Sequence, residues 1–452
     1  MNDLIRLPAR EVVRALGRGE IDRSSVLDAV ADRLRRVEPL VNAVPTVAVQ
    51  RARRDRRRPF GPLAALPITV KDVVDVAGLP TTYGSPLRRD AVARHSDPLV
   101  RRLEERGAVV VGKTNVPEFL AGADTVNALF GRTRNPWNGT LSCGASSGGA
   151  AVSVATGTSW CAHGEDTAGS IRIPAALCGV VGLRPTPGLV TAAGTGDPVP
   201  GFTVHGPIAR DVADAALFLR AMVPDEAVPY VAPGPLRRVA FTVDLGGRVP
   251  VTPEIAASCT RTVAALEGLG YRVEAYAPPV DGVHEACLTL LAHRAAVLHG
   301  ARVDRHGDRL GAALRAEVAA GRDRTPRQVA DAGWARTDFA GRVRALFARY
   351  DVLVTATFGR PPWPVGEGLD PLPAGEELAA VAAQWPLTTL ATMAGCPALT
   401  VPCGRTVAGD AVGLQLIGAP YTDVALLRAG RDVERVRDAV PALPVLPAVP
   451  AC

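Results

Sequence analysis

Lysine is nearly absent from this sequence of 452 residues. Of its 51 basic residues only Lys71 and Lys113 are lysines, and the other 49 are arginines. Wherever a plain positive charge is sufficient, the chain therefore uses arginine. A buried ammonium group can lose its proton near neutral pH, whereas a guanidinium group cannot. The two lysines are therefore candidates for positions where an arginine would fail.

Other scarce features exclude further classes of protein. The eight cysteines form no C-x-x-C pair and no His/Cys ligand spacing, so the sequence predicts no metal site and no cofactor. The N-terminus carries charges throughout, which is not typical of a secretory signal. The uncharged run from Trp385 to Gly404 contains three prolines, which argues against a membrane span. We therefore expect reduced, buried thiols and a cytoplasmic protein.

The charge balance does not favour nucleic acid as a partner. A net charge of +6 is mild for a chain of this length. The strongest basic run, Arg51 to Arg58, is interpreted as a solvated helix end that leads into a loop. Hydrophobic residues make up 47% of the chain, which is enough for a sizeable core. The oligomeric state is left open, with a homodimer as one alternative.

Strand-like and helix-like segments alternate along most of the chain, which indicates an α/β protein with a sheet covered by helices. Residues 280–348 are predicted to be mostly helical, and residues 185–210 to be irregular loops. No internal repeat or linker is evident, so we expect a single large domain over residues 1–440 and a proline-rich tail over 441–452. The clearest strands are predicted at residues 66–70, 108–112, 351–357, 398–402 and 412–418, and the clearest helices at 252–270 and 423–436.

The stretch GASSGGAAVS, residues 144–153, places two adjacent serines among glycines. Residues 144–148 match the G-x-S-x-G pattern of a nucleophile elbow, which would make Ser146 the nucleophile. That pattern needs a strand immediately before it, and the preceding RNPWNGTLSC is a poor strand. A phosphate-binding loop is excluded because no lysine follows the glycines. The nearest histidine, His163, belongs to a different kind of segment.

A second serine, Ser170, follows shortly in the segment EDTAGSIRIP. Small residues before Ser170 allow backbone N–H groups to point at one place, as an oxyanion hole requires. Two serines in glycine-rich loops and a lone lysine at a strand end suggest a base, relay and nucleophile without histidine.

At these residues the chain resembles the amidase signature family. The segment GASSGGAAVSVATGTSWCAHGEDTAGSIRIPA is similar to the serine- and glycine-rich signature of that family, and LPITVKDVVDVAGLPTTYGS is similar to its lysine segment. The likeness spans about residues 5–435 and is densest over 60–220. It implies the amidase signature fold, with a central mixed β-sheet covered by helices.

The resemblance also implies the catalytic residues. Lys71 corresponds to the catalytic lysine, Ser146 to a relay serine held by an unusual cis peptide, and Ser170 to the nucleophile. The backbone N–H groups of Thr167, Ala168, Gly169 and Ser170 are candidate oxyanion donors. For Lys71 to act as a base, burial must lower its pKa from about 10.4 to about 7.

Two local departures from the family pattern concern the surroundings of this site. Ala168 stands where many members have glycine, which bears on the geometry of the oxyanion hole. His163 and Glu165 stand where apolar and small hydroxyl residues are more usual, and they either reshape the pocket wall or pack beneath it.

Further polar residues are given structural roles rather than catalytic ones. Asp72 and Asp75 are interpreted as turn residues, and Arg172 as a brace for the Ser170 loop. Lys113 resembles a structural segment of the family and is assigned no chemistry.

The resulting functional hypothesis is an amidase, a hydrolase that cleaves a linear carboxamide C–N bond of a small molecule through an acyl-enzyme. Three alternatives stay open: the A subunit of a tRNA-dependent amidotransferase, a biosynthetic acyltransferase or amide synthase with an amine acceptor, and a non-catalytic binding protein. The resemblance places the acyl pocket in variable loops and the helical part, about residues 280–380. The histidines there do not follow a metal-ligand pattern.

Overall fold

A computed structural model describes residues 2–55, 61–192, 197–225, 234–366, 368–373, 375–439 and 443–444. Its centre is a mixed sheet with the strand order β1-β3-β2-β6-β8-β7-β12-β13-β11-β9-β10, and β4 and β5 form a separate two-stranded sheet. The strands are β1 (Thr46–Val47), β2 (Pro67–Lys71), β3 (Val109–Thr114), β4 (Val126–Asn127), β5 (Gly131–Arg132), β6 (Cys161–Asp166), β7 (Val181–Arg184), β8 (Val204–Ala209), β9 (Arg238–Phe241), β10 (Arg272–Ala275), β11 (Val352–Ala356), β12 (Ala398–Arg405) and β13 (Ala411–Gly418).

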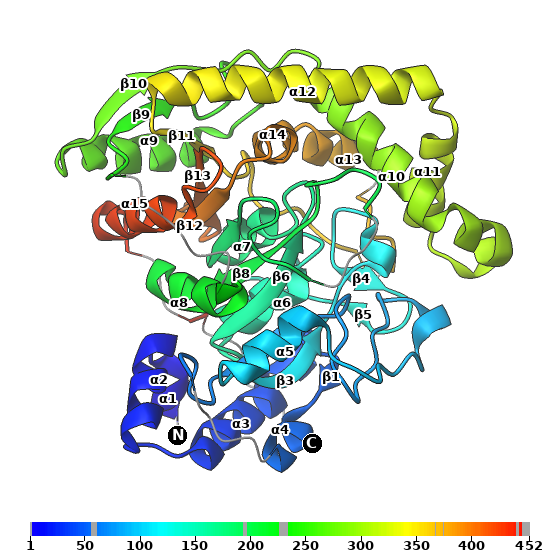
Figure 1. Cartoon of the computed structure of the whole chain (residues 1–452), viewed down its shortest axis with the longest axis vertical. Helices are drawn as coiled ribbons and strands as arrows, with labels where there is room; N and C mark the ends of the chain where they lie inside the picture. The colour runs from blue at the N-terminus through cyan, green and yellow to red at the C-terminus, as the bar shows by residue number, and fades with distance from the viewer. Residues whose placement is uncertain are drawn as a thin grey trace.

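Helices surround the large sheet (Figure 1). The described residues form α1 (Asn2–Arg6), α2 (Ala9–Arg18), α3 (Arg23–Val41), α4 (Val49–Arg54), α5 (Pro98–Glu105), α6 (Gly148–Ala155), α7 (Arg172–Cys178), α8 (Val212–Met222), α9 (Pro253–Glu267), α10 (Val283–His306), α11 (Ala312–Arg322), α12 (Pro326–Arg349), α13 (Gly375–Ala382), α14 (Pro386–Ala394) and α15 (Asp423–Val436). Short 3₁₀ turns are η1 (Pro86–Arg88), η2 (Glu118–Leu120) and η4 (Gly307–Arg309).

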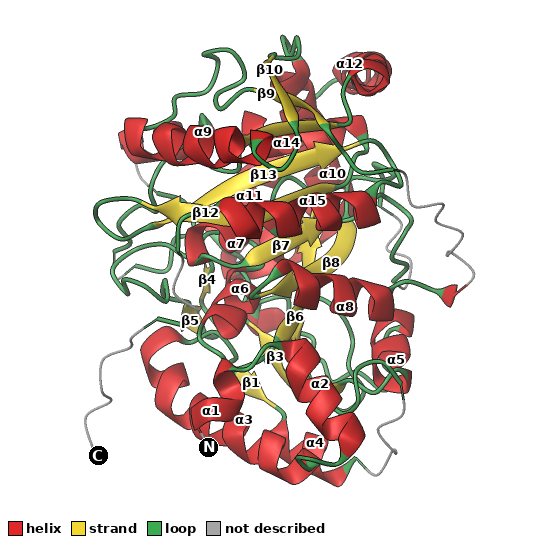
Figure 2. Cartoon of the chain, turned by 90° about the vertical axis from the view of Figure 1, so that its left-hand side faces the viewer, coloured by secondary structure: helices red, strands yellow, loops and turns green. Residues whose placement is uncertain are grey.

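The layers explain why several strands are apolar throughout. In Figure 2, α9, α15 and α8 lie over the face of the sheet that is turned to the viewer, and α6 and α7 also pack against its strands. All residues of β2 and β3 are buried, as expected for strands covered on both faces. Strand β2 pairs in parallel with β3 and β6, whereas β6 and β8 are antiparallel, which makes the sheet mixed.

Helices α10, α11 and α12 form a further layer, with α12 across the top of Figure 1 and α10 and α11 at its right-hand side. Helix α12 begins with a capping box in which Thr325 and Gln328 satisfy each other's backbone N–H groups, and Pro326 occupies the first turn. Helices α10 and α11 pack against each other, and α10 also packs against α12 and α14. This layer is the helical region predicted over residues 280–348.

The predicted α/β class, the mixed sheet and the single domain are confirmed, and the largest of three hydrophobic clusters in the described residues extends from Ile5 to Val433. The prediction of irregular loops over 185–210 is wrong at its end, because β8 lies between β6 and β7. Gly206 and Pro207 conceal this strand in the sequence. A side chain at Gly206 would place its Cβ 2.1 Å from the carbonyl oxygen of Leu183, so this position requires glycine.

Two other predictions concern segments that lie partly outside the described residues. Arg51 to Arg54 end α4 as expected, and residues 56–58 of the basic run lie outside the described part. Most of the proline-rich tail also lies outside it, and the boundary at residue 440 stays a prediction. Within the described ranges, no helix combines the length and the apolar character that crossing a membrane requires.

Candidate active site

Lys71 is the last residue of β2, and its side chain is completely buried. Its Nζ lies 2.7 Å from Ser146 Oγ and donates to the carbonyl oxygen of Glu165 at 3.2 Å. Burial lowers the pKa of Lys71 to about 8, although the charges of Glu165 and Asp166 oppose that shift. Roughly a tenth of this amine is therefore neutral at pH 7, far more than for an exposed lysine.

Ser146 lies in the loop before α6, and the peptide bond between Ala145 and Ser146 is cis. The glycines that follow it are required by close packing. A Cβ at Gly148 would lie 2.3 Å from Thr125 Oγ1, and one at Gly149 would lie 2.5 Å from the backbone nitrogen of Asn115. The start of α6 can therefore lie against the neighbouring loops only without side chains.

Ser147, the other serine of the pair, joins three segments of the site. Its backbone N–H donates to the carbonyl oxygen of Ser170 at 3.0 Å. Its hydroxyl donates to the carbonyl oxygen of Glu165 at 3.1 Å and accepts from the Glu165 N–H at 3.3 Å. These bonds hold the double-serine loop against the Ser170 loop.

Ser170 lies between β6 and α7, half-buried, in a turn that depends on Gly169. Gly169 has φ +120°, and a Cβ there would lie 2.7 Å from Thr388 Oγ1. Both facts exclude a larger residue at this position. Ser146 and Ser170 line the same pocket.

Two threonines of α14 orient the peptides that precede Ser170. Thr392 Oγ1 donates to the carbonyl oxygen of Thr167, and Thr388 Oγ1 donates to that of Ala168, each at 2.7 Å. In a trans peptide the N–H points away from the carbonyl, so these bonds also fix the directions of the N–H groups of Ala168 and Gly169. The N–H of Gly169 donates to Asp166 Oδ1 at 2.9 Å, so one of the four candidate oxyanion donors is already bound.

Asp166, the last residue of β6, anchors the Ser170 loop through hydrogen bonds and ion pairs. Its carboxylate accepts from the N–H of Gly169 and of Ile171 and forms ion pairs with Arg172 and Arg184 at 2.9 and 3.5 Å. The three charged side chains are fully buried. Burial alone would raise the pKa of Asp166, but the two guanidinium charges hold it well below its usual range. The bracing role predicted for Arg172 agrees with these contacts.

His163 and Glu165 lie on β6 beneath the pocket, and neither belongs to its lining. His163 Nε2 lies 3.0 Å from Nδ1 of His205 on β8, and their rings stack. Burial lowers the pKa of His163 well below its usual value, so the ring is neutral at neutral pH. Of the two interpretations left open from the sequence, packing beneath the pocket is the one that the structure supports.

The second lysine occupies a different buried site. Lys113 Nζ forms an ion pair with Asp72 Oδ1 at 2.9 Å and donates to the carbonyl oxygen of Pro80 and to Thr81 Oγ1. Asp72 therefore binds Lys113 and joins the turn that follows β2 through Thr82. The structural role predicted for Lys113 agrees with this geometry.

The pocket at the two serines has a volume of about 480 Å³. Its walls are mainly apolar and come from the two serine loops, from residues 119–123, from α10 and α11, and from segments around Phe358, Trp363 and Trp385. The structure thus agrees with a pocket built largely from loops and the helical layer. Among the residues that the structure describes, no group of three His, Cys, Asp or Glu side chains could hold a metal ion.

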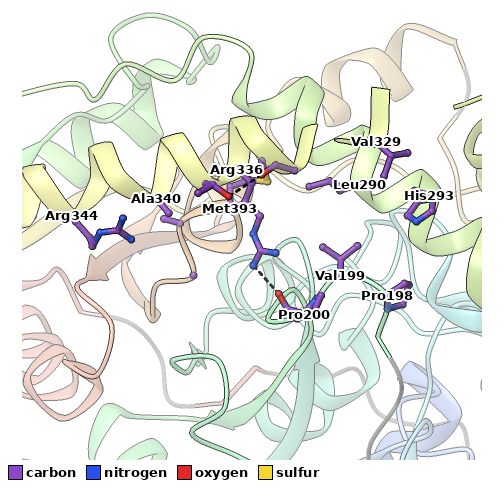
Figure 3. A pocket seen from close by; sticks show the side chains of 14 residues that line it. Pro198, Val199, Pro200, Leu290, His293, Val329, Arg336, Ala340, Arg344 and Met393 are labelled. Carbon is purple, nitrogen blue, oxygen red and sulfur yellow. Dashed lines mark hydrogen bonds between the residues drawn. The ribbon is translucent and has the colours of Figure 1, made fainter. Parts of the chain in front are cut away.

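A second pocket of about 440 Å³ lies on the other side of α10, between α12 and residues 198–200 (Figure 3). Arg336 crosses it and donates to the carbonyl oxygen of Pro200 at 2.9 Å. None of Lys71, Ser146 and Ser170 lines this pocket, so it is not the place of the proposed chemistry.

Sequence reasoning missed four residues that shape this site: Ser147, Asp166, Thr388 and Thr392. Only Asp166 could have been found from the sequence. It stands just before a glycine-containing turn, where a carboxylate can accept hydrogen bonds from the N–H groups of the loop. The two threonines carried no such signal, because they reach the loop from more than 200 residues along the chain.

Known proteins resemble the chain over almost its whole length, and they include acylamidases and an amidotransferase subunit. A solved bacterial aryl acylamidase of the amidase signature family superposes with a TM-score of 0.86 at 26% identity, covering 95% of this chain and 96% of that one. The acylamidase of Rhodococcus erythropolis is 33% identical, with 95% of each chain covered. The glutamyl-tRNA(Gln) amidotransferase A subunit of Moorella thermoacetica is 34% identical, covering 96% of this chain and 97% of that protein.

The Amidase family model matches residues 25–427. The chain therefore belongs to the Amidase family, as the resemblance of its motifs implied.

Proposed function

We propose that this amidase-family enzyme hydrolyses a linear C–N bond of a small carboxamide through an acyl-enzyme on Ser170. The observation that carries the proposal is the buried Lys71 amine, 2.7 Å from Ser146 Oγ and with a lowered pKa. An amine in this state can accept a proton, whereas an exposed lysine would already be charged. The small, mostly apolar pocket at Ser170 supports a small-molecule substrate.

In this proposal the proton moves through two hydroxyl groups. Ser170 Oγ attacks the amide carbonyl carbon and gives its proton to Ser146 Oγ, while Ser146 gives its own proton to Lys71 Nζ. The tetrahedral oxyanion is bound by the free N–H groups among Thr167, Ala168 and Ser170. The proton then returns to the departing amine as the C–N bond breaks, and water hydrolyses the resulting ester.

A fluorophosphonate probe tests the nucleophile directly. We expect one covalent adduct, mapped by mass spectrometry to Ser170, and no adduct in the Ser170→Ala variant. The Ser146→Ala variant retains the nucleophile but lacks the relay, so it is expected to be labelled more slowly. An adduct on any other residue would contradict the assignment of Ser170.

The pH dependence of kcat/KM tests the base. Because Lys71 must be neutral, activity should rise with pH and level off above the lysine pKa of about 8. The Glu165 carboxylate raises that pKa, so Glu165→Gln should move the acidic limb of the profile to lower pH, by up to about one unit. Glu267→Gln on the exposed face of α9 is the matched control and should leave the limb in place. A limb that stays fixed in Glu165→Gln would show that it does not report Lys71.

The similarity to an amidotransferase subunit supports a second candidate function, the transfer of an amide nitrogen within a larger assembly. The two functions differ in what the purified chain does alone. A hydrolase releases the carboxylic acid from small amides without a partner, and added amines do not divert the product. Activity that appears only with a partner protein, or an amide product formed from an added amine, would favour transfer.

A further inference from the structure

Helix α11 presents mainly alanines to the pocket at Ser170. Ala313, Ala316 and Ala320 line it at helical spacing, and Glu317 lies on the same face. Small side chains on this face leave open space around a long acidic one. A carboxyl group on an otherwise apolar pocket wall therefore requires an explanation from its partners.

The Glu317 carboxyl has little to bind within the described part of the chain. Its one hydrogen bond there is from the backbone N–H of Gly122 to Oε1, at a long 3.3 Å. No lysine, arginine or histidine of the described residues lies within ion-pair distance of it, which is unusual for a carboxyl group in such a place. The second carboxyl oxygen is left without a partner in this part of the structure.

Three basic side chains line the pocket, those of Arg294, His299 and Arg324, and none of them lies within ion-pair distance of Glu317. Arg294 is held by Asp197, with Nε 3.0 Å from Oδ2, and also donates to Thr203. His299 lies against the Arg302 guanidinium and the ring of Phe119. Arg294 and His299 are thus directed to their own partners. Arg324, just after α11, is exposed and forms no ion pair within the described residues.

The surroundings of Glu317 favour its protonated, neutral form. Glu317 is an exposed residue, and its side chain is part of the pocket lining. Partial loss of water between the pocket walls raises the pKa of Glu317 to about 7, although the hydrogen bond from Gly122 and the charge of Arg294 oppose that shift. A cation beside the carboxyl would favour its ionised form and relieve the cost of a lone charge.

We propose that Glu317 is a specificity-determining residue that binds a protonated amino group of the substrate. The preferred substrates are then amides that carry an ammonium group at the end of an apolar chain, with the chain against the alanine face of α11 and the scissile carbonyl at Ser170. This inference rests on the proposed function, because Glu317 would bind one end of the substrate whose amide is cleaved at Ser170 in the same pocket.

Matched substrates test the proposal. Each pair shares an apolar chain that ends in either NH₃⁺ or CH₃, placed on the acyl chain of a p-nitroanilide or on the leaving amine. For one chain length we expect the wild type to prefer the ammonium substrate in kcat/KM by about 10- to 100-fold, as for one hydrogen bond between charged groups. In Glu317→Gln the preference should fall to about threefold or less, with the CH₃ substrate almost unaffected.

Two controls separate the possible failures. Glu285→Gln removes an exposed acid on α10 that is not part of the pocket, and should keep the wild-type preference. Calorimetry with n-alkylammonium chlorides and the Ser170→Ala variant measures binding without catalysis, and Glu317→Gln in that background should abolish it. Hydrolysis of neutral amides without any ammonium preference would overturn the role of Glu317 alone. Absence of amide hydrolysis together with alkylammonium binding would instead count against the proposed function.

Discussion

Replacing Lys71 by methionine should lower kcat/KM for an aryl amide by about 10⁴-fold or more, the loss typical of a triad member. The Lys71 side chain is fully buried, and its amine lies next to Ser146 Oγ. Methionine keeps most of the buried volume and removes the amine that accepts the serine proton. Steady-state assays on purified variants measure the effect.

The Lys71→Arg variant distinguishes a base from a positive charge. A guanidinium group keeps the charge and the length but cannot be deprotonated, so this variant is also expected to be inactive. Substantial activity in Lys71→Arg would show that the site needs a cation and would refute the proton relay.

Lys113 provides a matched comparison, because it is the other buried lysine of the chain. Lys113→Met leaves the Asp72 carboxylate buried without its partner, which should destabilise the protein by about 3–5 kcal/mol. Lys71→Met removes an amine that has no carboxylate of the described residues within ion-pair distance, and should change the free energy of unfolding by about 1 kcal/mol or less. Urea unfolding of both variants measures this contrast. Equal destabilisation by the two substitutions would contradict the different roles given to the lysines.

The two lysines also show how far sequence reasoning reached. Their scarcity and the position of Lys71 at the end of an apolar strand led to a base without histidine, and the structure places that amine beside Ser146. Strong local patterns were interpreted correctly: β13 and α15 were predicted to within a residue of their ends. Strand β8 was missed because Gly206 and Pro207 look like loop residues, whereas its place in the sheet is set by contacts with β6 and β7.

The polar contacts around Ser170 could not be predicted for a related reason. Thr388 and Thr392 meet the Ser170 loop through the fold alone, and an ordinary helical spacing gives no hint of that contact. Glu317 is similar, because an acidic residue in a charged helix gives no sign that it faces a cavity. Local patterns therefore indicated the groups that we propose to react, while the residues that orient them depend on long-range packing.

Replacing Asp166 by asparagine should destabilise the protein by about 3–5 kcal/mol, because it leaves the buried charges of Arg172 and Arg184 without their carboxylate. The N–H groups of Gly169 and Ile171 would also lose charged acceptors. Since these bonds position Ser170, we expect kcat to fall by roughly 100-fold even in the folded variant. Thermal and urea unfolding measure the first effect, and steady-state kinetics at a temperature where the variant is folded measures the second.

Asp281→Asn is the matched control, because its ion pair with Arg248 lies at the surface and should contribute about 1 kcal/mol or less. If Asp166→Asn is too unstable to purify, Thr392→Val removes a single bond to the loop carbonyl of Thr167 and should cost about 1 kcal/mol, with a smaller loss of kcat. An Asp166→Asn variant as stable and active as Asp281→Asn would contradict the anchoring role.

Acid unfolding provides a second measure of the same anchor. The pKa of Asp166 lies well below its usual range in the folded protein, so the unfolded chain binds this proton more readily than the folded one. The contribution of Asp166 to stability is therefore complete above the unfolded pKa of about 3.9 and is lost as the pH falls toward the folded value. Between about pH 5 and pH 3 the wild type should lose free energy of unfolding more steeply than Asp166→Asn, whose side chain does not titrate. Parallel curves for the two proteins over this range would mean that the Asp166 carboxylate does not anchor the loop through its charge.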